Sequence, residues 1–297
     1  MYPVPLTYDF VFKDPAVRPW LMAELADAGV KHLVLSVGLI NQIMQDASQL
    51  NAIEKDMKNA GLDFVDAHSP FCLEADMSLL ETAQRRIMIT RHKLALEIAS
   101  YFHTGNITMH VGHNQPMPDV PFPMQTHVAM VTDALGQLLP LAEELQTSIS
   151  IENIWTPLNT PEQLIEWKKM FPTDALGFCY DAGHANLMSG SGKSFTAGDA
   201  AVSWRYHTTG TPPWDDQIID KMQSDIVTCH LHDNSGEHDR HLLPGSGSIN
   251  WQNIREKLMA APRLKCIQSE VAPIHNRIPL KKLVRKFEEL FPECKDL

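Results

Sequence analysis

The 297-residue chain has few cysteines and no long apolar run, and both shortages exclude classes of protein. Its five cysteines are odd in number and widely spaced, so they indicate reduced thiols rather than a disulfide framework. The most apolar early stretch, residues 30–40, is interrupted by Lys31 and His32 and is too short to cross a bilayer. The first residues show neither a basic region nor an apolar core of a secretory signal. We therefore expect a globular cytoplasmic protein without a membrane partner.

Basic residues are also scarce. The chain has 25 Lys and Arg against 36 Asp and Glu, a formal net charge of −11. Binding to a polyanion such as DNA needs lysines and arginines set against phosphates. The overall charge therefore disfavours a nucleic-acid partner, although a local basic stripe would suffice for one.

Eight short apolar or β-branched segments alternate with stretches of helical period, which is typical of βαβ units and parallel pairing. The predicted strands are Thr7–Val11, His32–Val37, Leu62–Ala67, Ile107–Val111, Ser148–Glu152, Leu176–Asp181, Ile226–His232 and Lys265–Val271. The predicted helices are Pro15–Ala28, Asn41–Ala60, Met77–Tyr101, Pro123–Gln146, Pro161–Met170, Trp251–Ala261 and Leu280–Leu290. Eight units in a chain of this length indicate an α/β protein, a single (β/α)8 TIM barrel spanning residues 1–297.

The alternative to a barrel is a doubly wound open sheet, but no GxGxxG follows the first predicted strand. No linker or second domain is recognisable. One long irregular segment, Leu187–Asp216, follows the sixth predicted strand. Long loops inside compact domains are usually functional, so this segment is a candidate lid.

Polar residues gather at the carboxyl ends of the predicted strands, which meet at one face of a barrel, where active sites are built. They are His68, His110, His113, Glu152, Asp181, His184, His230, His232, Asp239, His241 and Glu270. Imidazole and carboxylate groups are ligands for Zn²⁺ or Mn²⁺ in sites with open positions. A carboxylate at the end of an apolar strand is costly to desolvate without a partner. The set therefore predicts a divalent-metal site.

Several of these residues stand in short motifs: Asp181-x-x-His184, His230-x-His-Asp-Asn234, and Asp239-x-His241 followed by Pro244-Gly-x-Gly247. With Glu152 and Glu270 in the same chain order, the motifs resemble those of the xylose-isomerase-like barrel superfamily. That superfamily includes sugar (phosphate) isomerases and epimerases and the endonuclease IV type of apurinic/apyrimidinic endonuclease. The motifs are specific for the superfamily but not for one reaction.

The resemblance implies between one and three ions. In the endonuclease pattern, three zinc ions would be held by His68, His110 and Glu152, by Glu152, Asp181, His230 and Glu270, and by His184, Asp239 and His241. In the isomerase pattern, one ion would lie on Glu152, Asp181, His230 and Glu270, while His184 and Arg240 would contact substrate. This sequence keeps all of these positions, so the ligands alone do not separate the two patterns.

The surrounding loops favour the isomerase pattern. The segments 69–77, 112–125 and 153–160 contain no Lys or Arg, whereas an enzyme that contacts many phosphates needs basic loops. We therefore expect a metal-dependent isomerase or epimerase of a small sugar, sugar phosphate or related hydroxy-carbonyl compound, acting through an enediolate. A zinc-dependent AP endonuclease is the alternative. The oligomeric state stays open and a homo-oligomer is compatible with the sequence.

In the favoured reaction, Glu152 and Glu270 are the expected catalytic base and acid. The expected metal ligands are His68, His110, Glu152, Asp181, His184, His230, Asp239, His241 and Glu270. Substrate contacts are expected from His113, His232, Arg240 and Trp155.

Overall fold

A computed structural model of the chain describes residues 3–7, 14–112, 123–190, 198–207 and 211–294. Eight parallel strands form one sheet in the order β3-β2-β1-β8-β7-β6-β5-β4. The strands are β1 (Leu6–Thr7), β2 (His32–Leu35), β3 (Asp63–Ala67), β4 (Asn106–Met109), β5 (Ser148–Glu152), β6 (Leu176–Asp181), β7 (Ile226–Leu231) and β8 (Gln268–Ser269). A parallel bridge between His68 and Thr108 joins the two outer strands and closes the ring. The predicted α/β TIM barrel is confirmed.

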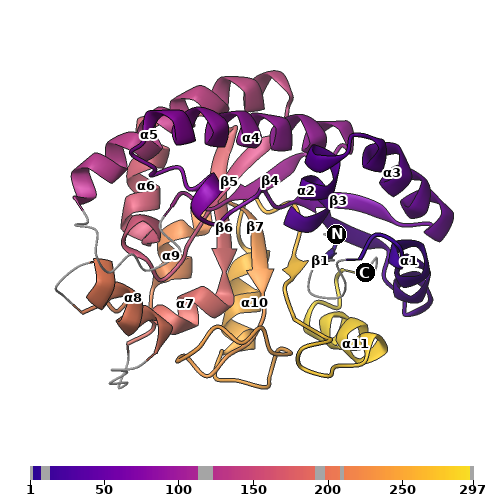
Figure 1. Cartoon of the computed structure of the whole chain (residues 1–297). Coiled ribbons are helices and arrows are strands. Elements are labelled where there is room, and N and C mark those ends of the chain that lie inside the picture. The colour runs from indigo at the N-terminus through magenta and orange to yellow at the C-terminus, as the bar shows by residue number, and fades with distance from the viewer. Residues whose placement is uncertain (1–2, 8–13, 113–122, 191–197, 208–210, 295–297) are drawn as a thin grey trace.

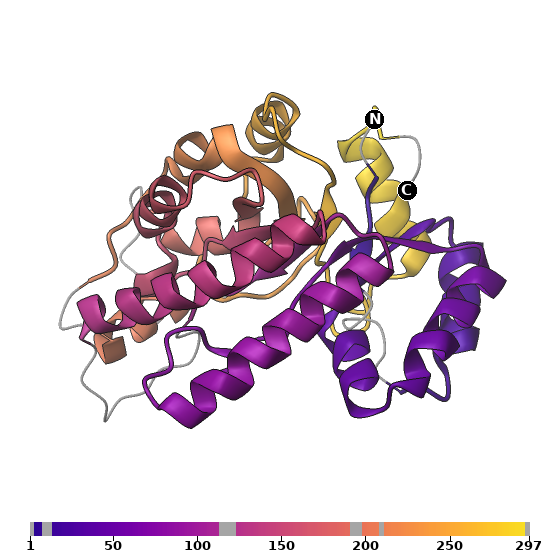
Figure 2. The same cartoon turned by 90° about the horizontal axis from the view of Figure 1, so that it is seen from above.

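Helices cover the outer surface of the sheet (Figure 1). They are α1 (Arg18–Asp27), α2 (Val37–Gln45), α3 (Ser48–Ala60), α4 (Thr82–Tyr101), α5 (Met124–Glu144), α6 (Pro161–Met170), α7 (Ala182–Met188), α8 (Asp199–His207), α9 (Ile218–Met222), α10 (Trp251–Met259) and α11 (Leu280–Leu290). The two longest, α4 and α5, run side by side in Figure 2. Among the described residues, no helix is both long and apolar enough to cross a membrane.

Alternation along the strands decides which side chains reach the inside of the barrel. In β5 every residue is buried, because helices cover one face and the barrel interior covers the other. Ser148 and Ser150 donate hydrogen bonds to Asn106 Oδ1 inside the barrel, whereas Ile149 and Ile151 belong to the apolar core. Successive side chains point to opposite faces, so Glu152 also faces the interior, at the carboxyl end of the strand.

The predicted helix over residues 41–60 is wrong, because two helices occupy this region. Helix α2 starts earlier, at Val37, so the preceding strand ends at Leu35 rather than at residue 37. Asp46 is extended, and its carboxylate accepts a hydrogen bond from the backbone N–H of Ser48 at 2.9 Å. A short polar side chain that satisfies a free N–H of a first turn separates two helices in this way.

Some other predicted boundaries also differ. The last strand is two residues long instead of seven, and α4 begins at Thr82, where the Glu81 carboxylate accepts the N–H of Gln84. Most of the first predicted strand lies outside the described residues. The segment 187–216 is not wholly irregular, since it contains α8.

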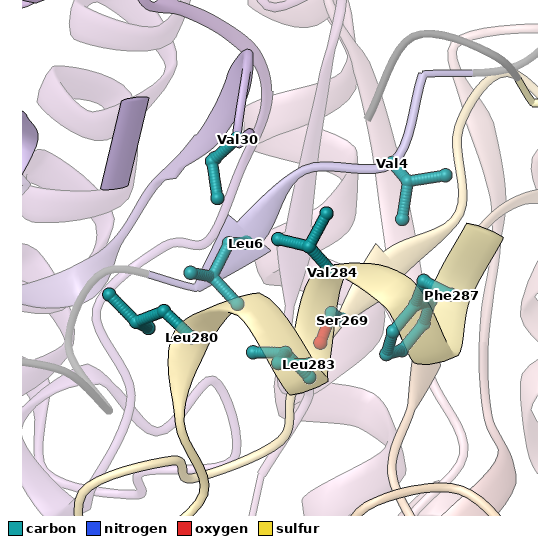
Figure 3. A pocket seen from close by; sticks show the side chains of 8 residues that line it. All are labelled: Val4, Leu6, Val30, Ser269, Leu280, Leu283, Val284 and Phe287. Atoms are coloured by element: carbon teal, nitrogen blue, oxygen red, sulfur yellow. The ribbon is translucent and has the colours of Figure 1, made fainter. Parts of the chain in front are cut away.

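Helix α11 packs against β1 and β8, the first and last strands of the chain, which pair with each other. Leu283 and Phe287 of this helix are buried against Val4 and Leu6 around a small cavity of about 20 Å³ (Figure 3). Ser269 of β8 also lines this cavity, which places its side chain on the helix-facing side of the sheet. The neighbouring side chains of β8 therefore point into the barrel.

Candidate metal centre

Ten polar side chains converge at the carboxyl ends of the strands, and most of them are buried. They are His68, His110, Glu152, Asp181, His184, His230, His232, Asp239, His241 and Glu270. Four overlapping groups of three ligand atoms lie within 4.8 Å of one another. The groups are His68–Glu152–His230, Asp181–His230–Glu270, Asp181–His184–His232 and His232–His241–Glu270. The structure thus brings residues from the carboxyl ends of six strands, β3 to β8, and from the following loops into one cluster.

Glu152 contacts histidines from several elements. Its Oε2 lies 3.0 Å from Nε2 of His110, 3.7 Å from Nε2 of His68 and 3.4 Å from Nδ1 of His230. Its Oε1 lies 3.0 Å from Nδ1 of His184. Burial would raise the pKa of this carboxyl, but His230 and His110 hold it well below its usual range. Glu152 is therefore ionised, although only 1% of its side chain is exposed.

His230 is fully buried among three carboxylates. Its Nδ1 lies 3.2 Å from Glu270 Oε1, 3.4 Å from Glu152 Oε2 and 3.8 Å from Asp181 Oδ2. Within the described part of the chain, neither ring nitrogen has a hydrogen-bond partner. Burial would lower the pKa of His230, but Glu270 and Glu152 raise it to about 10. Without another cation, these carboxylates draw a proton onto the ring.

A second part of the cluster surrounds Asp239. Its Oδ2 lies 3.0 Å from Nε2 of His241 and 3.6 Å from Nε2 of His184, and its Oδ1 lies 3.7 Å from Nε2 of His232. The rings of His232 and His241 stack with their centres 3.9 Å apart. Burial opposes the charge on His241, but Asp239 raises its pKa to about 9. This part of the cluster also holds positive charge in place.

The Asp181-x-Gly-His184 motif has a local structural reason. Asp181 ends β6 and caps α7, and its Oδ1 accepts the backbone N–H of His184 at 2.6 Å. At Gly183 an added Cβ atom would collide with the ring of His232. The motif therefore places Asp181 and His184 at one turn and leaves room for a third ligand-type side chain above it.

Asp233 holds the loop after β7, a positioning role that the sequence did not identify. Its Oδ2 accepts hydrogen bonds from the N–H of Gly245 at 2.8 Å and from the indole N–H of Trp251 at 2.9 Å. Backbone hydrogen bonds also pair Asp233 with Leu242. The segment with Asp239 and His241 is thus anchored at both ends. Asp233 follows the histidine pair directly, and this was the available signal.

The residues of the cluster fit a divalent metal ion. Imidazole nitrogens and carboxylate oxygens are the donors that zinc and manganese take. Buried polar atoms normally have hydrogen-bond partners, and exceptions require an explanation. Here the exceptions among the described residues include both ring nitrogens of His230, Nδ1 of His232 and Oδ1 of Asp239. A bound cation would occupy such atoms, and the charge of the carboxylates favours one.

The residues expected to contact substrate fall in different places. His232 lies inside the cluster, fully buried, with Nε2 3.2 Å from Asp181 Oδ2. Trp155 lies at its edge and packs its ring across that of His184, with centres 4.8 Å apart. Arg240 is exposed, and its carbonyl accepts a hydrogen bond from Asn276. His113 lies outside the described residues.

Comparison with known proteins identifies the family. Residues 22–267 match the family model described as the xylose isomerase-like TIM barrel, and the chain therefore belongs to that family. A curated relative, the uncharacterized protein MJ1311 of Methanocaldococcus jannaschii, is 25% identical over 237 residues, which cover 76% of this chain and 70% of the relative.

Solved structures share the whole fold at low identity. A D-tagatose 3-epimerase-like protein has a TM-score of 0.70 with 19% identity, and covers 99% of both chains. The 3-keto-D-glucoside 4-epimerase of E. coli has a TM-score of 0.68 with 14% identity over the full length of both chains. The IOLI protein, solved with a zinc atom, has a TM-score of 0.69 with 13% identity over the full length of both chains. The endonuclease alternative is not favoured by these similarities.

Proposed function

We propose that the protein is a divalent-metal-dependent isomerase or epimerase of a small sugar, sugar phosphate or related hydroxy-carbonyl compound. The observation that carries this proposal is the position of His230, buried without hydrogen bonds to described residues between Glu152 and Glu270. A protein that only stored a metal ion would not need an acid–base pair at the same place. The names of the solved neighbours support sugar epimerisation as the chemistry.

One ion would be held by Glu152, Asp181, His230 and Glu270, and the zinc atom in the IOLI structure supports zinc as one candidate beside manganese. Up to two further ions would be held by His68 and His110 with Glu152, and by His184, Asp239 and His241 with His232. When bound, a divalent ion stabilises the negative charge of an enediolate. The third of these ion sites adds His232 to the expected metal ligands. The spacing of His232 from His230 places both rings on one side of β7.

Glu152 and Glu270 would move the proton between substrate carbons. They end β5 and follow β8, and both carboxylates border His230. One would remove the proton beside the carbonyl while the other returns it, as base and acid. Gln268 donates a hydrogen bond to Glu270 Oε1 at 2.9 Å and fixes the position of that carboxylate. This pairing would allow either epimerisation or isomerisation.

The walls around the cluster would suit a small carbohydrate. Phe71 stacks on the ring of His110 with centres 4.7 Å apart, and Trp155 borders His184. Such rings offer apolar faces against which the C–H groups of a sugar can pack. Arg240 would contact polar groups of the substrate from the rim, and His113, outside the described residues, stays a proposed substrate contact. The low number of basic residues in the described loops argues against a nucleic-acid substrate.

The decisive experiment follows deuterium. Metal-loaded protein is incubated in D2O with a panel of ketoses, aldoses and their phosphates, and products are analysed by NMR. We expect solvent deuterium on the carbon beside the carbonyl, and no exchange after treatment with a chelator until zinc or manganese is returned. Product whose carbon-bound hydrogen is fully retained would exclude proton transfer by the glutamates. Turnover of no member of the panel, together with incision of abasic DNA at physiological salt, would replace the proposal by the endonuclease alternative.

A further inference from the structure

A second pocket lies on the other side of β6 from the metal centre. It has a volume of about 230 Å³ and is lined by residues of β6, α7, α9, α10 and the segments before α9 and α10. Successive side chains of a strand point to opposite faces. Asp181 points into the barrel and joins the metal centre, and the preceding Tyr180 points outward and lines this pocket. The two sites therefore share a strand but no lining side chain.

Tyr180 contributes a phenol group to the lining of this pocket. The residue is only 2% exposed, and it lies where β6 meets the pocket. A phenol is both a donor and an acceptor at neutral pH. An occupant of the pocket that carries hydroxyl groups would exchange a hydrogen bond with it.

The remaining lining combines acidic and amide groups with an apolar wall. The charged residues that line the pocket are Asp215 and Asp216, and both are acidic. Asp215 pairs with Lys221 at 2.7 Å, and Asp216 accepts a hydrogen bond from Ser189 at 2.5 Å. No basic side chain is among the lining residues that the structure describes, so a phosphate or carboxylate would meet only negative charge.

The apolar wall is made of isoleucines from the loop before α10 and from α9 and α10. Ile218 and Ile219 are buried, and Ile249 and Ile254 complete the wall. The amide of Asn253 stands at the exposed side. Sites that combine apolar surface with a few convergent polar groups are typical of small-molecule binding. The volume is below the range typical of drug-sized ligands, so the occupant is small.

We infer that this pocket is a second binding site, for a small uncharged polyhydroxylated molecule such as a polyol or free sugar. The Tyr180 hydroxyl bonds to one hydroxyl of the ligand, and the asparagine and aspartate groups bond to others. The inference does not depend on the proposed reaction, because none of its lining residues belongs to the metal centre.

D-Sorbitol is a suitable probe, since it has no carbonyl group and cannot undergo the proposed reaction. Metal-loaded protein with ¹³C-labelled isoleucine methyl groups is titrated with D-sorbitol and followed by NMR. We expect saturable shifts of the methyl signals of Ile218, Ile219, Ile249 and Ile254. The methyl of Ile154, two residues after Glu152 in the chain, serves as the reporter for binding of sorbitol to the other site. Sorbitol 6-phosphate should bind the pocket at least tenfold more weakly.

Three variants test which side chains of the pocket bind sorbitol. Tyr180→Phe removes only the hydroxyl and should weaken binding by roughly two- to tenfold, the effect of one neutral hydrogen bond. Asn253→Trp fills the mouth of the pocket and should abolish the shifts. Gln252→Trp, on the neighbouring exposed residue of α10, is the matched control and should change nothing.

Several results would overturn the inference. These are the absence of saturable shifts at the four methyls, shifts that persist in Asn253→Trp, an unchanged affinity of Tyr180→Phe, and equal binding of the phosphate. Because none of these readouts uses catalytic activity, they stay distinct from a failure of the proposed function.

Discussion

Two clusters of buried polar groups lie inside the barrel, and they differ in how their atoms are satisfied. The lower cluster consists of Asp66, Asn106, Thr228 and Cys266. Asp66 Oδ1 accepts hydrogen bonds from the N–H of Ala67 and from the side-chain amide of Asn106, both at 2.8 Å. Its Oδ2 accepts from the Thr228 hydroxyl at 2.5 Å and from the Cys266 thiol at 3.0 Å. Every oxygen of this fully buried carboxylate therefore has two partners.

The metal centre above it leaves key atoms without partners. Both nitrogens of His230 and one oxygen of Asp239 are buried without a hydrogen bond to any described residue. The two clusters share residue types and burial, so neither property distinguishes structure from function. The hydrogen bonding of Asp66 and of His230 does separate these two clusters, although unpartnered buried atoms also occur outside the metal centre, for example Oγ1 of Thr108. The carboxyl-terminal face of a barrel is where active sites lie, whereas the opposite end contributes stability.

The same chemical change in each cluster tests this contrast, and the larger effect is expected at the metal centre. Glu270→Gln keeps size and removes the charge, so turnover should fall by about 10²–10⁴-fold, the usual contribution of an acid–base group. Steady-state kinetics measures this, with elemental analysis of the same sample because Glu270 is also a proposed ligand. A fall of less than about tenfold with the metal retained would show that Glu270 is not the acid or base.

Asp66→Asn is the matched change in the lower cluster. It replaces one accepting oxygen with an N–H₂ donor that faces other donors, and hydrogen bonds to a buried charge are worth about 1.5–3 kcal/mol each. We expect the free energy of unfolding to fall by about 2–4 kcal/mol, measured by urea denaturation, while metal content stays the same. A stable variant that loses metal would instead place Asp66 in the functional cluster.

The sequence predicted the barrel well because eight apolar strand patterns alternate with helical ones. It failed where local polar groups decide a boundary. A helical period continues through Asp46, but its side chain satisfies an N–H of the next helix and breaks the helix there. Strand β8 is also shorter than its apolar pattern, because a ladder needs a paired residue of a neighbouring strand at each position.

The site could be predicted only in part. Asp66 and His68 are two residues apart, so both follow the alternation that points into the barrel. Depth separates them: Asp66 lies among Asn106 and Thr228, and His68 lies beside Glu152. A linear sequence gives the side on which a residue lies but not the layer. His232 is predicted to contact substrate, and the structure buries it fully beside Asp181, which a linear sequence cannot show.

Two fully buried histidines, His92 and His230, differ in the same way in their hydrogen bonds. His92 has a partner at each nitrogen: the Ser69 hydroxyl at Nδ1 and the Ala75 carbonyl at Nε2, both at 2.8 Å. Burial lowers its pKa to about 4. His230 has no hydrogen bond to a described residue, and carboxylates raise its pKa to about 10. A satisfied ring stays neutral, whereas a ring among carboxylates attracts positive charge.

This difference predicts a pH dependence of stability. The folded pKa of His92 lies below its unfolded value of about 6.5, so its stabilising contribution is full above pH 6.5 and is lost as the pH falls towards 4. We expect His92 to contribute a loss of about 1.5 kcal/mol in unfolding free energy between pH 6.5 and 5. Histidines with raised pKa values gain stability as the pH falls over this range, and His110, whose pKa is lowered by burial, loses it, so the contribution of His92 is read from the difference between two proteins.

Urea denaturation of chelator-treated protein at the two pH values measures this loss without interference from metal release. His92→Gln is the control, because an amide can keep both hydrogen bonds but does not titrate. The decline should be smaller in this variant by the amount assigned to His92. An equal decline in both proteins would assign the pH dependence to other groups.

The smallest effect on the fold is expected at the rim of the metal centre. Asp239 and His241 each have 17% of their side chain exposed, so their removal leaves a gap that water can enter. The double variant Asp239→Ala with His241→Ala should therefore stay folded, with its metal-free stability changed by about 1 kcal/mol or less. If these residues hold an ion of their own, elemental analysis should find about one fewer ion per chain, because His184 and His232 alone offer two ligands where metal sites usually need three or more from the protein. An unchanged metal content would instead make Asp239 and His241 substrate or structural groups. The metal centre would then consist of the ion site around His230, and the contrast with the lower cluster would rest on that ring alone.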